Sequence, residues 1–251
     1  KPYNTCSQIC VYCQRNWEIN QVLEGQAMAS SPQLEAAYDW IREHTAIREV
    51  LVTGGDPLVM SNSRIKSVLE ELSRIDHVER IRIGSRTPVV LPQRLTDPLR
   101  DIIESYNEPG RREVALVTHV EHVYEVTPEM MHAVQMFKKR GMSVYNQAVF
   151  TVENSRRFEL VALRRMLRRI GIDPYYTFNT KGKEETKHFR VPMARLRQEI
   201  KEEARITPGL MRTDEPVYNV PGLGKNYLRA LQHHSLLSIT PDGRRVYEFH
   251  P

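Results

Sequence analysis

The sequence of 251 residues contains only three cysteines, and all three lie within its first 13 residues. An odd number of cysteines cannot form a closed set of disulfides, which argues against a secreted, disulfide-rich domain and favours a reducing cytoplasm. The sequence also lacks an apolar run close to the roughly 20 residues that a membrane-spanning helix needs, and it shows no signal peptide. Internal repeats and low-complexity segments are missing as well. These absences predict a globular cytoplasmic protein without a membrane partner.

The chain is long enough, and at 40% hydrophobic residues apolar enough, to bury the core of a single α/β domain. Its first residue is Lys1 rather than methionine, and the cysteines follow almost at once. We therefore expect the chain to be a fragment of a longer protein.

The formal net charge of +5 could by itself indicate nucleic-acid binding. The basic residues, however, are mixed with acidic ones in helical segments such as 157–171. In that segment we expect a solvated helix face formed by Arg164, Arg165, Arg168 and Arg169. The charge distribution therefore argues against a nucleic-acid partner.

Short β-rich runs alternate with amphipathic helical patterns along the first 180 residues. The runs are EVLVTGGD (49–56), RIRIGSR (80–86), EVALVTHV (113–120), SVYNQAVF (143–150) and DPYYTFNT (173–180). This alternation implies a parallel sheet, either doubly wound or closed toward a barrel. Polar residues at the strand ends favour a barrel, because those ends converge on one mouth. These residues are Asp56, Ser85, His119, Gln147 and Asn179.

We predict an α/β fold in the form of a partial parallel (β/α)6-type barrel with a small C-terminal extension. Five strands are visible, and we expect a sixth to precede Cys6. The predicted barrel core spans residues 1–190, and residues 191–251 form a helix followed by a mixed tail.

The cysteines, Cys6, Cys10 and Cys13, have the spacing C-x3-C-x2-C in a polar segment. Structural zinc sites use four ligands and pair two knuckles, and the sequence contains no second knuckle. Three thiolates can instead hold three irons of a 4Fe–4S cluster and leave the fourth iron open for a substrate or cofactor. The spacing therefore predicts such a cluster.

With an aromatic residue, Tyr12, before the last cysteine, this motif resembles the signature of radical S-adenosylmethionine enzymes. The resemblance implies that S-adenosylmethionine binds the open iron, and that the barrel is of the radical SAM kind. The segment VTGGDP (52–57) could be an ordinary turn. In this context it is similar to the superfamily's glycine-rich strand, which implies that Gly54, Gly55 and Asp56 bind the cofactor.

Further segments resemble one family within that superfamily, the lysine 2,3-aminomutases. They are RIGSRTPVVLPQR (82–94), THVEHVYEVTPE (118–129), YNQAV (145–149), PYY (174–176) and HFRVP (188–192). The resemblance implies contacts to S-adenosylmethionine from Leu51, Ser85, His119 and Gln147. Without the resemblance, His119 would be interpreted as an ordinary core or surface histidine. Tyr12 stands where the lysine enzymes have histidine.

The segment NVPGLGKNY (219–227) could be a surface turn, and it lacks the Walker A spacing of nucleotide-binding loops. In the aminomutases a proline- and glycine-rich turn ends in the lysine that binds pyridoxal phosphate. The resemblance assigns that role to Lys225, although the turn is one residue shorter and has Leu223 among the glycines.

The substrate pocket departs from that of the lysine enzymes. Arg15 matches the arginine that binds the substrate α-carboxylate, or else it is a surface residue. Lys181 and Asn219 stand where the lysine enzymes have two aspartates that bind the distal ammonium group. A cation and a neutral amide would disfavour a cationic side chain and favour an anionic one. This pair resembles glutamate 2,3-aminomutase.

The sequence thus predicts an isomerase that moves the α-amino group of an amino acid, glutamate for preference, to the β carbon. The implied cofactors are a 4Fe–4S cluster, S-adenosylmethionine and pyridoxal 5′-phosphate. The implied partners are a small-molecule substrate and an electron donor such as flavodoxin or ferredoxin. The sequence leaves open whether the chain also forms a homo-oligomer. The alternative is a radical SAM enzyme that acts on lysine, free or in a protein, or that modifies RNA.

Overall fold

The computed structural model describes residues 1–13, 21–180, 184–220, 224–229 and 234–249. Within them, seven strands form one sheet whose spatial order is the same as their order in the chain. The first six strands are parallel, and the seventh is antiparallel to the sixth. The strands are β1 (Glu49–Val52), β2 (Arg80–Gly84), β3 (Glu113–Thr118), β4 (Ser143–Phe150), β5 (Asp173–Asn179), β6 (Glu215–Val220) and β7 (Gly224–Tyr227).

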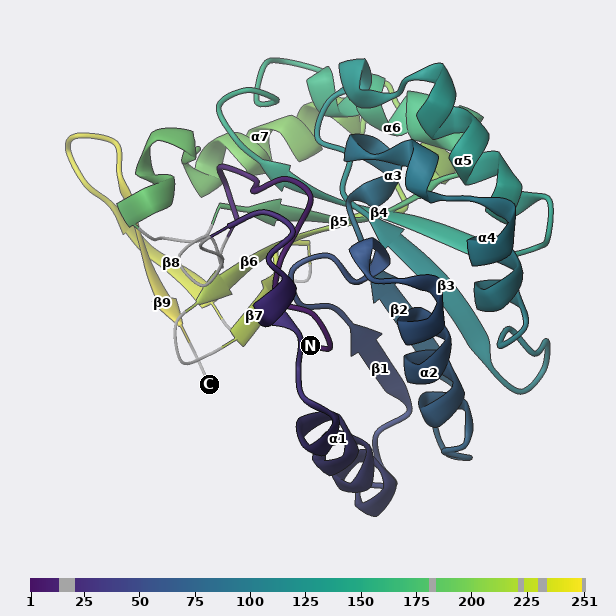
Figure 1. Cartoon of the computed structure of the whole chain (residues 1–251). Helices are drawn as coiled ribbons and strands as arrows, with labels where there is room; N and C mark the ends of the chain where they lie inside the picture. Colours follow the sequence, from purple (N-terminus) through teal and green to yellow (C-terminus); the bar gives the residue numbers. More distant parts are fainter. Residues whose placement is uncertain (14–20, 181–183, 221–223, 230–233, 250–251) are drawn as a thin grey trace.

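One helix precedes the first strand and the others connect the first six strands in turn, along the outer face of the curved sheet (Figure 1). They are α1 (Ser31–Glu43), α2 (Asn62–Ser73), α3 (Thr87–Val90), α4 (Asp97–Glu104), α5 (Pro128–Lys138), α6 (Glu159–Arg169) and α7 (Met193–Glu203). A separate antiparallel hairpin is formed by β8 (His234–Ile239) and β9 (Arg245–Phe249). No helix in the described part of the chain is long and apolar enough to cross a membrane.

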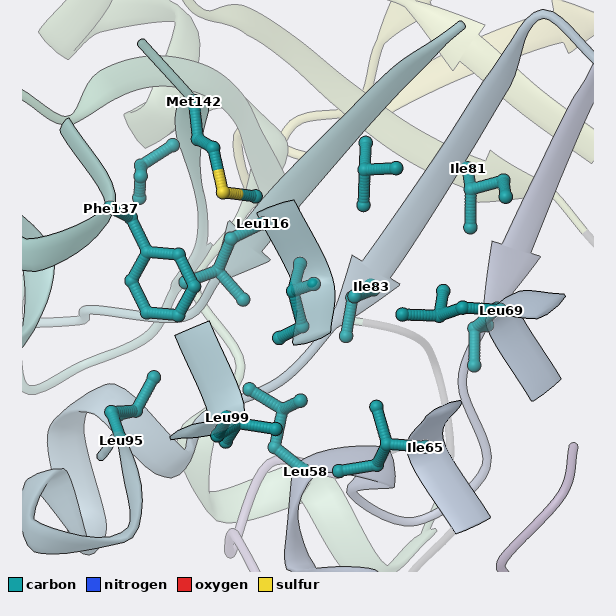
Figure 2. Packing of buried hydrophobic residues seen from close by; sticks show 14 of the residues in the cluster. Leu58, Ile65, Leu69, Ile81, Ile83, Leu95, Leu99, Leu116, Phe137 and Met142 are labelled. Atoms are coloured by element: carbon teal, nitrogen blue, oxygen red, sulfur yellow. The ribbon is translucent and has the colours of Figure 1, made fainter. Parts of the chain in front are cut away.

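The main core lies between the parallel strands and helices α2, α4 and α5. In β4 every second residue is fully buried toward the helices, and the residues between them are partly exposed. This is the period of two that a strand imposes on its side chains. Figure 2 shows Ile81 and Ile83 of β2 and Leu116 of β3 packed with Leu99 of α4 and Phe137 of α5. The other face of each strand is therefore free to line the barrel interior.

The predicted partial parallel barrel is confirmed, and the five predicted strands correspond to β1–β5. The sixth parallel strand is β6, which pairs with β5, whereas the sequence placed a sixth strand before Cys6. At that place Tyr3 forms isolated bridges, parallel to Gly54 and antiparallel to Met28. The sheet thus continues past residue 190 into the C-terminal extension, and the division there stays a prediction.

The prediction of a solvated arginine face on α6 is wrong for one of its four residues. Arg165 and Arg169 are exposed and Arg168 is half-buried, but Arg164 has a side chain only 3% exposed. Its guanidinium pairs with Glu203 and, at 2.6 Å, with Asp214. The apolar stripe of α6 faces the sheet, and Arg164 lies on it because two carboxylates beyond the helix neutralise its charge.

Candidate active site

One pocket of about 450 Å³ lies at the carboxyl ends of the parallel strands, where the N-terminal segment crosses them. Its walls come from both ends of the sequence. They include all three cysteines and ten further residues predicted for the site: Tyr12, Leu51, Gly54, Gly55, Asp56, Ser85, His119, Gln147, Asn219 and Lys225. Because parallel strands place their carboxyl ends at one edge, residues far apart in the sequence converge there.

The cysteine loop is held against the end of β1 by backbone hydrogen bonds. The N–H groups of Gly55 and Asp56 donate to the carbonyl oxygens of Tyr3 at 3.0 Å and Thr5 at 2.7 Å. A Cβ atom on Gly55 would lie 1.9 Å from the Thr5 oxygen, and one on Gly54 would lie 2.0 Å from the Tyr3 oxygen. The two glycines are therefore required by the close approach of the N-terminal segment, as well as lining the pocket.

The Asp56 carboxylate organises the loop after β2. It accepts hydrogen bonds from the Ser85 hydroxyl at 2.6 Å and from the backbone N–H groups of Arg86 at 2.8 Å and Thr87 at 2.9 Å. It also accepts from the N–H of Leu58 at 3.0 Å. Buried carboxylates need such partners, and here they come from two separate loops. Asp56 thus fixes the position of Ser85 at the pocket wall.

The Arg86 side chain reaches across the pocket to the cysteine loop. Its Nη1 atom lies 3.2 Å from the Cys10 Sγ atom, and its Nη2 atom pairs with Glu125 at 2.5 Å. Burial raises the pKa of the Cys10 thiol, and the positive charge of Arg86 opposes that rise. The structure thus places the Arg86 cation beside a cysteine sulfur.

His119 enters the pocket directly after β3, whereas Gln147, predicted at a strand end, enters it from within β4. The side chain of Asn146 accepts from the Val120 N–H at 2.7 Å and donates to the Val120 carbonyl at 3.0 Å, which fixes the segment after β3. Burial, and to a smaller extent the nearby Arg86 cation, lower the pKa of His119 to about 4. The imidazole is therefore neutral at physiological pH, so one ring nitrogen can donate and the other can accept.

The sequence did not identify Glu121, a buried acid beside the predicted cluster loop. Its carboxylate accepts from the Val149 N–H at 2.6 Å. Burial, together with the negative charge of Glu125, raises the pKa of Glu121 to about 8. The carboxyl is thus mostly protonated at neutral pH. No spacing in the sequence marks this residue, because it is positioned by contacts between different strands.

Lys225 and Asn219 face each other across the antiparallel pair of β6 and β7. Cross-strand partners place their side chains on the same side of the sheet, and both residues line the pocket. The Lys225 Nζ atom lies 4.0 Å from the centre of the Tyr176 ring. Burial lowers the pKa of Lys225, and the positive charge of Arg82 lowers it further.

Two residues predicted to bind the substrate cannot be placed, and one residue predicted at the barrel mouth does not line the pocket. Arg15 and Lys181 lie outside the described residues. Asn179, expected at the barrel mouth, donates its side-chain amide to the Val191 carbonyl at 3.1 Å, and Phe178 lines the pocket instead. That the pocket residues bind a cluster, cofactors or substrate stays a prediction.

The donor set suits an iron–sulfur cluster. Three thiols from one loop line a pocket that also contains the Ser7 side chain, whose buried oxygen has no hydrogen-bond partner among the described residues. Within the described residues, no three histidine, cysteine, aspartate or glutamate side chains are grouped to hold a single metal ion. A cluster bound through three separate irons does not require the sulfurs to converge on one point.

Comparison with solved structures defines the class of fold. SuiB of Streptococcus suis, solved with S-adenosylmethionine, matches 81% of this chain and 45% of its own with a TM-score of 0.59 and 14% identity. A radical SAM methyltransferase of Sphaerobacter thermophilus matches 86% of this chain and 64% of its own, with a TM-score of 0.53 and 15% identity. The chain therefore has the partial-barrel fold of radical SAM enzymes.

Comparison with curated sequences defines the family more closely. An uncharacterised KamA family protein of Methanocaldococcus jannaschii is 48% identical over the whole chain, which covers 40% of that protein. The glutamate 2,3-aminomutase of Clostridioides difficile is 35% identical over 74% of this chain and 42% of its own. The L-lysine 2,3-aminomutase of Bacillus subtilis is 35% identical over 95% of this chain and 49% of its own.

The chain is thus a homologue of the 2,3-aminomutases, as the sequence motifs predicted. It spans less than half the length of these three relatives. No protein-family model matches it.

Proposed function

We propose that the chain is the catalytic core of a radical S-adenosylmethionine, pyridoxal-phosphate-dependent amino acid 2,3-aminomutase. The observation that supports this most strongly is the shared pocket of the three cysteines and Lys225, which come from opposite ends of the chain. A cluster and a lysine-bound cofactor would then act on one substrate in one cavity. A flavodoxin or ferredoxin is our proposed source of electrons.

When bound, these cofactors supply a carbon-centred radical and a conjugated ring that stabilises the radical formed on the substrate. The chain's own residues bind and orient them. Cys6, Cys10 and Cys13 supply thiolates for three irons, and neutral His119 supplies a hydrogen-bonding group at the end of β3. The lowered pKa of Lys225 increases the fraction of its Nζ that is unprotonated, which an amine needs to attack a carbonyl.

The assignment of the cluster and of Lys225 can be tested separately. Anaerobic reconstitution should give bound iron and sulfide that are lost in Cys6→Ala, Cys10→Ala and Cys13→Ala. Borohydride treatment in the presence of pyridoxal phosphate should add a covalent mass at Lys225. Lys66→Ala, an exposed lysine of α2, is the matched control and should leave that labelling intact. Labelling spread over surface lysines, with none at Lys225, would refute the assignment.

We further propose glutamate, or another acidic amino acid, as the substrate. The proposal is supported by Asn219, a neutral amide opposite Lys225, and by Lys181 in the sequence, at positions where lysine enzymes have aspartates. An ammonium group would meet no carboxylate from either residue, whereas a carboxylate would meet one cation. The relatives include both glutamate and lysine enzymes at 35% identity, so identity does not separate the two substrates.

Competition between the two substrates tests this choice. The reconstituted parent protein should convert glutamate to its β-amino isomer faster than it converts lysine, as measured by chromatography of derivatised products. Asn219→Asp should shift the preference toward lysine, because it restores one anion beside Lys225. Turnover of lysine but not glutamate by the unmodified protein would contradict the substrate assignment while leaving the enzyme class intact.

A further inference from the structure

Arg86 connects the loop after β2 to the cysteine loop, and its guanidinium has a defined partner on each side. The Nη1 atom lies 3.2 Å from the Cys10 Sγ atom and 3.4 Å from the Gln8 Oε1 atom. The Nε atom donates to the His119 carbonyl at 3.3 Å. The side chain is only 15% exposed, so solvent screens its charge weakly.

Two further contacts hold this guanidinium in place. Glu125, at the end of the short 3-10 helix η5 (Val123–Glu125), pairs with the Nη2 atom, and the Tyr12 ring centre lies 5.9 Å from the Arg86 Cζ atom. The backbone of Arg86 is fixed in turn by Asp56, which accepts from its N–H at 2.8 Å. A surface arginine would have none of this support, and its side chain would be free to leave the sulfur.

We propose that Arg86 is a positioning residue that sets the reduction potential of the cluster held by Cys6, Cys10 and Cys13. This inference rests on the proposed function, since it requires that the cysteines bind a cluster. Each electron added to the cluster makes it and its thiolates more negative by one charge. A cationic N–H donor at a ligand sulfur stabilises the reduced state more than the oxidised state, and so raises the potential.

Glu125 acts in the opposite direction, because its carboxylate neutralises part of the Arg86 charge. The pair therefore predicts shifts of opposite sign. Removing the Arg86 charge should lower the potential, and removing the Glu125 charge should raise it. A role of Arg86 in folding alone would not reverse sign between the two variants.

The test is a redox titration of the anaerobically reconstituted protein, with dithionite as electron source and mediator dyes, followed by electron paramagnetic resonance of the reduced cluster. Arg86→Gln should reduce the ratio of reduced to oxidised cluster at a fixed potential about tenfold, which corresponds to about 59 mV for a one-electron couple. Glu125→Gln should increase that ratio. Arg86→Lys keeps the charge and should lie closer to the unmodified protein. Arg111→Gln removes an exposed arginine charge from the loop before β3 and should leave the ratio unchanged.

The outcomes separate this inference from the proposed function. If the unmodified protein takes up no cluster, the proposed function fails and this inference fails with it. If the cluster binds normally but neither Arg86→Gln nor Glu125→Gln changes the ratio, only the inference is overturned. If Arg86→Gln loses the cluster, the Glu125→Gln variant decides. An unchanged ratio of reduced to oxidised cluster in that variant overturns the inference, and an increased ratio supports it.

Discussion

Replacing Arg164 by methionine should destabilise the protein more than any change at its exposed neighbours on α6. The guanidinium is the cation between two buried carboxylates, Glu203 at 0% and Asp214 at 1% exposure. Thr177 also donates to Asp214, at 2.6 Å. Removing one partner of a buried ion pair leaves an uncompensated charge, which costs about 3–5 kcal/mol. For a chain of this size the melting temperature should fall by roughly 6 to 20 °C.

The assay is urea unfolding of the apoprotein, followed by far-UV circular dichroism. Arg165→Met is the matched control, because Arg165 is the exposed next residue of the same helix. It should change the free energy of unfolding by no more than about 0.5 kcal/mol. The double variant Arg164→Met/Asp214→Leu removes the unpaired charge of Asp214 and should recover part of the loss.

The pH dependence gives this prediction a second measurement. Burial raises the pKa of Glu203 in the folded protein, and Arg164 opposes that rise. A carboxyl with a raised folded pKa contributes stability below its unfolded pKa and loses it as the pH rises through the folded value. The deficit of Arg164→Met should therefore be larger at about pH 8 than at about pH 5. Equal losses in Arg164→Met and Arg165→Met, or a deficit that grows in acid, would refute the reasoning.

Three other variants test the site and the core. Gly55→Ala should abolish cluster uptake, measured as bound iron, because its Cβ would lie 1.9 Å from the Thr5 oxygen; Gly209→Ala, where nothing lies within 4 Å, should not. Glu121→Gln should stabilise the protein progressively as the pH rises toward its pKa of about 8, by up to about 1.4 kcal/mol per pH unit. In acid, where the native carboxyl is protonated, urea unfolding should show no such gain. Phe137→Ala should cost about 3–5 kcal/mol in the same measurement, because its side chain is fully buried.

The positions of Ser85, His119 and Gln147 could be predicted from the sequence because they depend on local patterns. Ser85 and His119 directly follow β-rich runs and Gln147 lies within one, and the carboxyl ends of parallel strands meet at one edge of the sheet. The cysteine spacing is also local, so it identified the cluster loop without any knowledge of the fold. The sequence therefore predicted the pocket wherever a strand end or a short motif carried the information.

Arg164 could not be predicted, because its partners are distant in the sequence. Glu203 lies 39 residues away and Asp214 lies 50 residues away, and no local pattern signals that pairing. An arginine within a basic helical segment is usually solvated, and only the folded arrangement of β5, β6 and α7 brings the carboxylates to it. Glu121 and Glu125 were not predicted for the same reason, because their side chains contact residues that are distant in the sequence.

A different reason explains why the parallel strand β6 was not predicted. β6 begins at Glu215, beyond α7 and a turn, where the strand–helix alternation weakens in the sequence. Asp214, which directly precedes β6, pairs with Arg164 and accepts a hydrogen bond from Thr177 of β5. That connection links stability to the site, because β6 carries Asn219 opposite Lys225. A loss of the Arg164 network should therefore displace the predicted cofactor lysine as well as lower stability.

Asp56 shows why a short motif can have two structural roles at once. Its N–H donates to the Thr5 carbonyl, which directly precedes Cys6, and its carboxylate accepts from the N–H of Arg86. Asp56 thus binds both the backbone directly before the cysteine loop and the backbone of Arg86. The glycines before Asp56 are needed because the N-terminal backbone lies too close for any side chain. The motif at the end of β1 therefore joins the segment before the predicted cluster ligands to the loop that carries Arg86, before any cofactor binds.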